Sequence, residues 1–246
     1  MRTAPLARHR VVWGGVATAL ALGVGIGTWS VLGLGGVPTL GVRPGPTQTE
    51  GALEALGTYG EVPDFSLTER SGRVVTRADL LGKAWIANFI YTQCTETCPL
   101  QTAELARLQA DFVAEEDLRL VSITVDPERD TRAALSAYAE RYGADPVRWL
   151  FLTGDKRAIY RLAKEGFRLG VVDPDDPGAH AGALLQIFAP KPAWATHGSK
   201  GLIMHSARLV LVDRRARIRA YHLPNDDPSL ERLRRNARSV LRERQS

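Results

Sequence analysis

The pattern of apolar and polar positions predicts alternating strands and helices in the second two thirds of the chain. Runs rich in apolar and β-branched residues at 85–91, 118–125 and 149–152 are typical of strands buried on both faces. Apolar residues at helical spacing follow each run. The corresponding helices are expected at 99–112, 133–142 and 155–165, with Thr131 as the N-cap of the second. Strands that alternate with helices indicate an α/β fold with parallel strands in a central sheet.

Two hairpins are predicted on either side of this alternating part. Short apolar runs at 62–67 and 73–75 enclose a turn signal at 69–72 and indicate an opening hairpin. Near the carboxyl end, runs at 208–213 and 217–221 enclose a polar turn and indicate a second hairpin.

The two remaining segments differ in regularity. Segment 166–201 holds four prolines and many glycines, so we interpret it as a long surface insertion carrying short strands at most. Apolar residues at helical spacing from Leu230 to Leu241 predict a final helix rich in arginine. We expect this helix to pack on the sheet and to expose a solvated basic face.

The amino-terminal part predicts a membrane anchor. Residues 11–37 contain no charged side chain and exceed the ~20 residues that span a bilayer. A cleaved signal peptide is the alternative, but its apolar region is usually shorter and a clear cleavage site is missing. By the positive-inside rule, residues 1–10 stay in the cytoplasm. Residues 38–58, rich in Pro, Gly and Thr, are interpreted as a linker to a domain at 59–246.

The net charge of the chain does not indicate a nucleic-acid-binding function. The formal charge of +5 is concentrated in the tail, where ten arginines face four acidic residues between 214 and 246. No nucleic-acid-binding motif and no interleaving of aromatic and basic residues accompanies this excess. We therefore expect no nucleic-acid partner.

The strongest chemical signal is the pair Cys94 and Cys98, the only cysteines in the chain. They lie where the strand at 85–91 gives way to a helix, and Pro99 suits the first turn of that helix. Backbone N–H groups and the helix dipole stabilise a thiolate at such a position, so at least one thiol should ionise more readily than usual. A structural disulfide is the alternative, but a chain of this length can bury a sufficient core without one. A thiolate is both a redox nucleophile and a soft metal ligand.

Three ordered motifs resemble the Sco/SenC family, and the resemblance covers roughly residues 60–221. They are the segment 89–99 with its Cys-x3-Cys-Pro, the segment 125–131 (Val-Asp-Pro-Glu-Arg-Asp-Thr), and His205-Ser206 before the second hairpin. Three features depart from the family pattern. Thr95 stands where the family often has proline, segment 166–201 matches no motif, and Ala216 replaces an expected turn glycine.

The resemblance implies a thioredoxin-like fold, a central mixed sheet flanked by helices, behind an N-terminal transmembrane helix. It also implies copper delivery during cytochrome c oxidase assembly. Cys94 and Cys98 would form the redox-active pair and, with His205, bind Cu(I) in a site that also accepts Cu(II). His205 occupies the place where thioredoxins have a cis-proline. Asp126 would assist metal exchange or docking; the equally weighted alternative is that Asp126 and Asp130 cap the next helix and pair with nearby arginines.

The resemblance also sets expectations for partners and location. The partners would be the copper-site subunit of cytochrome c oxidase and either a thioredoxin-like reductant or another copper carrier. The chain would cross the bacterial inner membrane once, with its soluble domain on the periplasmic side.

Other functions remain open at this point. A thiol–disulfide oxidoreductase, or a redox or copper sensor acting on partner cysteines, would use the same dithiol. His205 favours a metallochaperone without turnover, because disulfide exchange does not require a histidine there. Zinc is less favoured because zinc sites usually have a fourth protein ligand. The peroxiredoxin motif is missing around Cys94.

Overall fold

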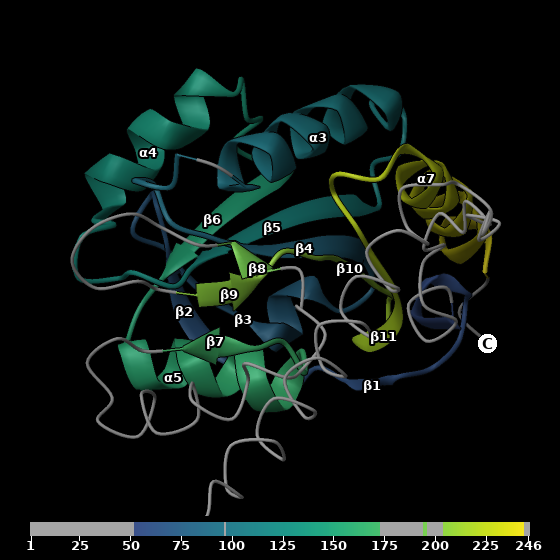
Figure 1. Cartoon of the computed structure of the whole chain (residues 1–246), viewed down its shortest axis with the longest axis horizontal. Coiled ribbons are helices and arrows are strands. Elements are labelled where there is room, and N and C mark those ends of the chain that lie inside the picture. Colours follow the sequence, from purple (N-terminus) through teal and green to yellow (C-terminus); the bar gives the residue numbers. More distant parts are fainter. Residues whose placement is uncertain (1–51, 96, 173–193, 196–203, 244–246) are drawn as a thin grey trace, which may run out of the picture. The chain divides into compact units, whose positions relative to one another are not determined.

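Figure 1 shows the computed structural model, which describes residues 52–95, 97–172, 194–195 and 204–243. At Val172, 194–195 and 204–206 the description is limited to the backbone. The strands are, in chain order, β1 (Gly60–Glu61), β2 (Ser66–Glu69), β3 (Val74–Thr76), β4 (Ala84–Ile90), β5 (Leu118–Thr124), β6 (Trp149–Thr153), β7 (Val171–Val172), β8 (Trp194–Ala195), β9 (Met204–Ser206), β10 (Leu209–Val212) and β11 (Arg217–His222). The helices are η1 (Arg77–Leu80), α3 (Thr97–Asp111), α4 (Arg132–Arg141), α5 (Lys156–Arg161), the π-helical turn η2 (Leu162–Gly166) and α7 (Asp227–Arg242).

The main sheet is mixed and has eight strands in the order β1-β11-β10-β4-β5-β6-β2-β3. Strands β4, β5 and β6 are parallel, and the other pairings are antiparallel. Helices α3 and α4 lie above this sheet in Figure 1, and α5 lies below it. A second, three-stranded sheet has the order β7-β9-β8. This arrangement is the expected thioredoxin-like α/β fold.

The central strands are those whose sequence is apolar on both faces. All seven residues of β4 are buried, and so are six of the seven in β5. Strands buried on both faces are typical of the middle of a covered sheet, and here β4 and β5 pair in parallel from Ala84 opposite Leu118 to Ile90 opposite Thr124. The predicted starts and ends of both strands are confirmed to within one residue.

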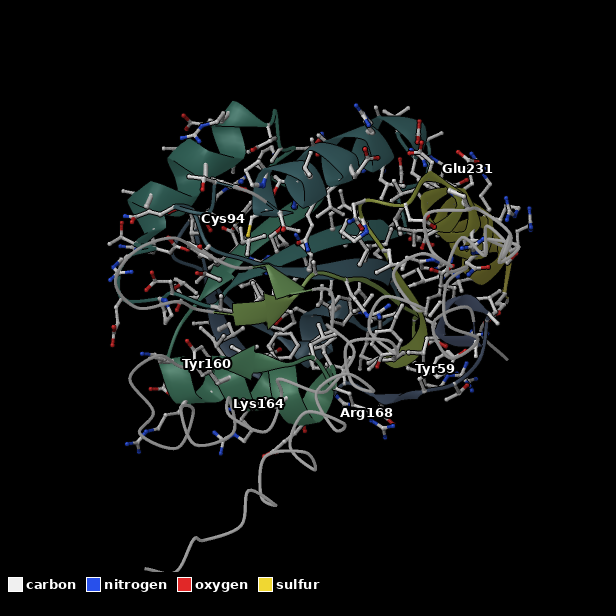
Figure 2. All side chains as sticks on the ribbon, in the orientation of Figure 1. Tyr59, Cys94, Tyr160, Lys164, Arg168 and Glu231 are labelled. Carbon is white, nitrogen blue, oxygen red and sulfur yellow. The ribbon has the colours of Figure 1, made fainter. Side chains whose placement is uncertain are left out.

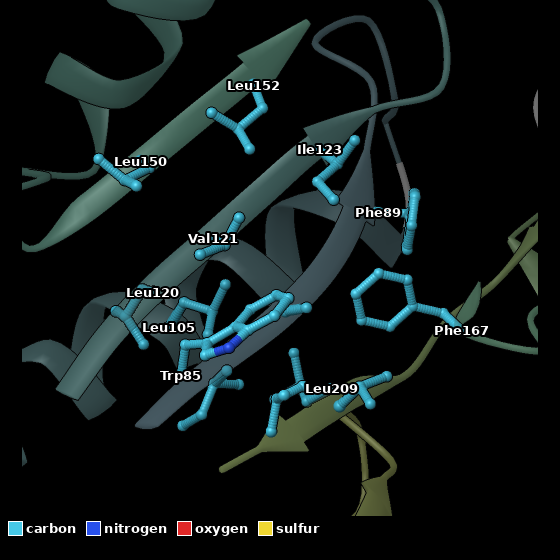
Figure 3. Close-up of a cluster of buried hydrophobic side chains, with 14 of the residues drawn as sticks. Trp85, Phe89, Leu105, Leu120, Val121, Ile123, Leu150, Leu152, Phe167 and Leu209 are labelled. Atoms are coloured by element: carbon cyan, nitrogen blue, oxygen red, sulfur yellow. The ribbon is translucent and has the colours of Figure 1, made fainter. Parts of the chain in front are cut away.

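An aromatic cluster fills the core beside β4 (Figure 3). The ring of Phe167 meets Trp85 edge-on at a centroid distance of 5.8 Å and meets Phe89 edge-on at 5.4 Å. All three side chains are at most 1% exposed. Phe167 belongs to the segment that we interpreted as a surface insertion, so its first residues are instead part of the core. Strands β7 and β8 are the short strands expected there; 173–193 and 196–203 lie outside the described residues.

Helices α4, α5 and α7 begin at side-chain caps. Thr131 accepts a hydrogen bond from Ala134 N at 3.2 Å, which confirms the predicted N-cap of α4. The next predicted helix forms in two pieces, α5 with Asp155 as its N-cap and then the π-helical turn η2. Helix α7 buries Leu230, together with further apolar residues at helical spacing. The prediction of a packed C-terminal helix is therefore confirmed.

The turn between β10 and β11 tolerates a residue other than glycine at Ala216. The φ angle of Ala216 is 59°, a left-handed conformation that costs a non-glycine residue roughly 1–2 kcal/mol. The carboxylate of Asp213 offsets this cost by accepting N–H bonds from Arg215 at 3.0 Å and Arg217 at 2.9 Å. The Asp213 side chain thus holds the turn in place of the expected glycine.

Residues 52–58, which the sequence assigned to a linker, pack against the domain. The carboxylate of Glu54 is buried, forms an ion pair with Arg232 and accepts a hydrogen bond from Ser229 Oγ at 2.7 Å. Asn236 Nδ2 donates to the main-chain oxygen of Glu54 at 2.8 Å and lies 3.2 Å from His222 Nε2. These contacts join the amino-terminal segment to α7, and Gly57 N joins it to β11 by donating to Arg219 O at 3.0 Å.

The predicted membrane span at 11–37 lies outside the described residues. Among the helices that the structure describes, none combines the length and the apolar character required to cross a bilayer.

Candidate metal and redox site

The two cysteines lie at the junction between β4 and α3. Strand β4 ends at Ile90, a turn in which Cys94 N donates to Tyr91 O at 3.2 Å follows, and Cys98 is the second residue of α3. The backbone N–H of Cys98 donates to Cys94 Sγ at 3.1 Å. Both residues are thiols in this structure, Cys94 being 6% exposed and Cys98 fully buried. The geometry therefore brings the two side chains together, as a dithiol site requires.

Burial dominates the electrostatics of Cys98. It raises the pKa of the Cys98 thiol far above the ordinary value, and the neighbouring Cys94 thiol raises it further. A backbone hydrogen bond to Cys98 acts in the opposite direction but is the smaller effect. Cys98 is therefore not a thiol that ionises readily, because a fully buried thiolate loses its hydration. The N–H of Cys98 is instead directed at the sulfur of Cys94, where it favours negative charge.

A buried hydrogen-bond chain supports the first turn of α3. Thr102 Oγ1 donates to Cys98 O at 2.7 Å and lies 2.9 Å from the hydroxyl of Tyr138 on α4. Burial raises the pKa of Tyr138, so this phenol stays protonated as a hydrogen-bonding group. The contacts hold the backbone of Cys98 against α4.

A second buried polar chain runs beneath α3. Asn88 on β4 donates to Gln101 Oε1 at 3.3 Å and accepts from Ser122 Oγ at 2.7 Å. Ser122 Oγ in turn accepts from Trp149 Nε1 at 3.0 Å. The chain couples the helix that carries Cys98 to all three parallel strands.

Asp130 joins the loop before Cys94 to the end of β5. This fully buried carboxylate accepts from Thr92 N at 3.0 Å, from Thr92 Oγ1 at 2.5 Å and from Thr124 Oγ1 at 2.5 Å. Burial raises the pKa of Asp130, and the bonds from the two threonines oppose that rise. Asp130 therefore anchors the loop, whereas Thr131 caps the following helix.

Asp126 has a different environment. Its carboxylate pairs with Arg129 at 3.2 Å, and the Arg129 side chain is 56% exposed. Its backbone N–H donates to Thr124 Oγ1 at 3.0 Å. The pairing that we considered for this residue is thus present, at the end of the strand that neighbours β4.

His205 lies in β9, where its backbone pairs with Val171 and Ala195. The next strand, β10, runs antiparallel to β4, with Val210 opposite Ala87. The start of β10 therefore lies at the end of the sheet where β4 leads to the cysteines. The chain runs directly from His205 in β9 to the start of β10. The structure describes only the backbone of His205, so its imidazole is not placed.

The other described histidine is structural. His222 is fully buried between Ser229 and Asn236, and burial lowers its pKa to about 4. Among the side chains that the structure describes, no group of three His, Cys, Asp or Glu residues is arranged to hold a metal. The predicted third ligand, His205, is outside that set.

Sequence reasoning missed the residues that hold the cysteine loop, chiefly Thr92, Thr124 and Tyr138. A usable signal existed for the two threonines. Each follows or ends one of two adjacent parallel strands, and the carboxyl ends of such strands meet at one edge of a sheet. Tyr138 had no comparable signal, because its position in α4 becomes meaningful only once α4 packs on α3.

Two thiols at a strand–helix junction within a mixed sheet define the class of thioredoxin-like dithiol proteins. Comparison with known proteins gives the family: residues 54–241 match the model of SCO1/SenC, so the chain belongs to the SCO1/SenC family.

Individual relatives agree with this family. The SCO1 protein homolog of Bacillus subtilis is 36% identical over 117 residues, which cover 47% of this chain and 61% of the relative. The solved structure of BsSco, described as a member of the Sco family of cytochrome c oxidase assembly proteins, is 24% identical with a TM-score of 0.57, covering 78% of this chain and 99% of BsSco. ScoI of Bradyrhizobium japonicum with copper bound has the same identity and a TM-score of 0.52, covering 73% and 99%. The match to the curated relative thus spans about three fifths of its length.

Proposed function

We propose that this protein binds copper through Cys94, Cys98 and His205 and delivers it during cytochrome c oxidase assembly. Membership of the SCO1/SenC family supports this role, as do the copper-bound structure of a family member and the description of BsSco as an oxidase assembly protein. The anchor at 11–37 would hold the domain on the periplasmic side of a bacterial inner membrane. The receiver would be the copper-site subunit of the oxidase.

The observation that carries this proposal is the contact between Cys98 N–H and Cys94 Sγ. This contact places the Cys94 sulfur against Cys98, whose thiol also neighbours the Cys94 thiol. Soft thiolates select Cu(I) among the biological metals. An imidazole from His205 would complete the ligand set and would also allow Cu(II) to bind. Because α3 and the loop are held by buried hydrogen bonds, the donors are positioned before the metal arrives.

Copper titration tests the ligand set. The reduced protein is titrated with Cu(I) against a chromophoric chelator, which reports both stoichiometry and affinity. We expect one Cu(I) per chain, loss of tight binding in Cys94→Ser and in Cys98→Ser, and weaker binding in His205→Ala. His197→Ala is the matched control, since it removes a histidine from the same part of the chain and should leave the affinity unchanged. Equal affinities for His205→Ala and His197→Ala would exclude His205 as a ligand.

A thiol–disulfide oxidoreductase acting on partner cysteines is the second candidate, and the same pair of neighbouring thiols favours it. The two functions separate in cells that carry His205→Ala. If the protein delivers copper, cells with His205→Ala should lose oxidase activity when copper is limiting. Added copper should partly restore that activity by mass action. If the protein is a thiol–disulfide oxidoreductase, cells with His205→Ala should retain full oxidase activity, whereas cells with either cysteine variant should lose it. Full oxidase assembly at limiting copper in the His205→Ala strain would refute copper delivery.

A further inference from the structure

A cavity of about 240 Å³ lies beside the end of β11, and neither Cys94 nor Cys98 is among its described lining residues. Its walls come from the amino-terminal segment, the turn after η2 and the last hairpin. The lining residues are Leu53, Tyr59, Arg168, Leu169, Arg208 and Tyr221. Figure 2 labels Tyr59 and Arg168, well apart from Cys94 in that view. The cavity thus combines an apolar and aromatic wall with two guanidinium groups.

The hydroxyl of Tyr221 is the unusual group in this cavity. Tyr221 is 4% exposed, and none of the described residues supplies its buried hydroxyl with a hydrogen-bond partner. The neighbouring Tyr59 differs, since its hydroxyl donates to Ala52 O at 2.6 Å and its ring meets Tyr221 edge-on at 5.8 Å. A buried O–H without an acceptor is costly, and a ligand that supplies an acceptor would remove that cost.

Positive charge faces the same hydroxyl. The charges of Arg168 and Arg208 oppose the rise that burial causes in the pKa of Tyr221, which is the effect of cations close to a phenol. Arg168 has a φ angle of 52°, an uncommon conformation for a residue other than glycine, and no described residue forms an ion pair with it. None of the described residues that line the cavity carries a carboxylate, and Glu54, next to Leu53, forms its ion pair with Arg232.

We propose that this cavity binds a small organic anion, a carboxylate or phosphate attached to an aromatic ring. The anionic oxygens would accept hydrogen bonds from the guanidinium of Arg168 and from the hydroxyl of Tyr221. The ring would lie against Tyr59 and the two leucines, where edge-on aromatic contact is favourable. The volume suits one ring and one anionic group, below the ~300–1,000 Å³ typical of sites for drug-sized ligands.

Calorimetry on the full chain in a non-ionic detergent tests the ligand class with four probes. Benzoate and phenyl phosphate should bind with a stoichiometry of one. Benzamide, which keeps the ring but lacks the charge, and inorganic phosphate, which keeps the charge but lacks the ring, should each bind at least tenfold more weakly. Benzamide binding as tightly as benzoate, or phosphate as tightly as phenyl phosphate, would overturn the proposal.

Three variants test the assignment to these residues. Arg168→Gln should weaken phenyl phosphate binding by roughly tenfold, because it removes a charge-assisted hydrogen bond. Tyr221→Phe should weaken it by about twofold to tenfold and leave the thermal midpoint unchanged or raised, since the hydroxyl lacks a described protein partner. Arg161→Gln is the matched control on an exposed arginine outside the cavity, and it should bind like the unmodified chain. Equal affinities for Arg168→Gln and Arg161→Gln, or a large fall in the thermal midpoint of Tyr221→Phe, would overturn the assignment.

Discussion

Replacing Asp130 by alanine should destabilise the protein by about 3 kcal/mol, a magnitude that follows from the three hydrogen bonds which the carboxylate accepts. The hydroxyl of Thr124 is fully buried, so leaving it without an acceptor costs about 1–3 kcal/mol. Thr92 is half-buried, and water can replace part of its two lost bonds, at about 0.5–1 kcal/mol each. Relief from burying a carboxylate offsets some of this loss, which keeps the total near 3 kcal/mol.

Urea unfolding of a fragment that begins at Pro46 measures this difference. Asp130→Asn should cost only about 1 kcal/mol, because one oxygen is retained and the amide is easier to bury than a carboxylate. Asp126→Ala is the control, since its partner Arg129 is more than half exposed and such pairs contribute about 1 kcal/mol or less. Equal destabilisation by Asp130→Ala and Asp126→Ala would refute the anchoring role of Asp130.

Three further predictions concern the amino-terminal segment, the thiols and acid stability. A fragment beginning at Tyr59 should be about 2–4 kcal/mol less stable to urea than one beginning at Pro46, because it lacks the buried glutamate that pairs with α7. In the native protein, iodoacetamide should modify Cys94 before Cys98, since Cys98 is fully buried and burial raises its pKa. Between pH 6.5 and about pH 4 the free energy of unfolding should fall by up to about 3 kcal/mol, because the buried His222, with its pKa lowered to about 4, cannot take up the proton that the unfolded chain binds.

A specific result would contradict each of these three predictions. Equal stability of the two fragments would show that residues 46–58 contribute nothing to the stability of the domain. Faster modification of Cys98, read by mass spectrometry of peptides, would contradict its burial. His222→Gln should flatten the acid slope, and an unchanged slope in that variant would assign it to other groups.

Local pattern alone was sufficient for the alternation of strands and helices and for the position of the dithiol. Strands β4 and β5 are rich in apolar residues, so their place in the covered middle of the sheet agrees with the need to bury both faces. The capping threonine at 131 was equally predictable, because a cap depends on residues only a few positions apart. The Cys-x3-Cys pair at the end of a buried strand also indicated the family by its motif.

Only the tertiary structure decided how deeply each group is buried and what it contacts. Cys98 is fully covered and Asp130 bonds to Thr92, 38 positions earlier in the chain. Phe167 packs in the core. Glu54 forms an ion pair with Arg232 of α7, which lies near the other end of the domain sequence. These outcomes depend on packing between segments that are distant in sequence, and hydrophobic periodicity carries no information about such distances. Burial in turn sets the ionisation of each thiol and carboxylate, so the chemistry of the site follows from the fold rather than from the motif.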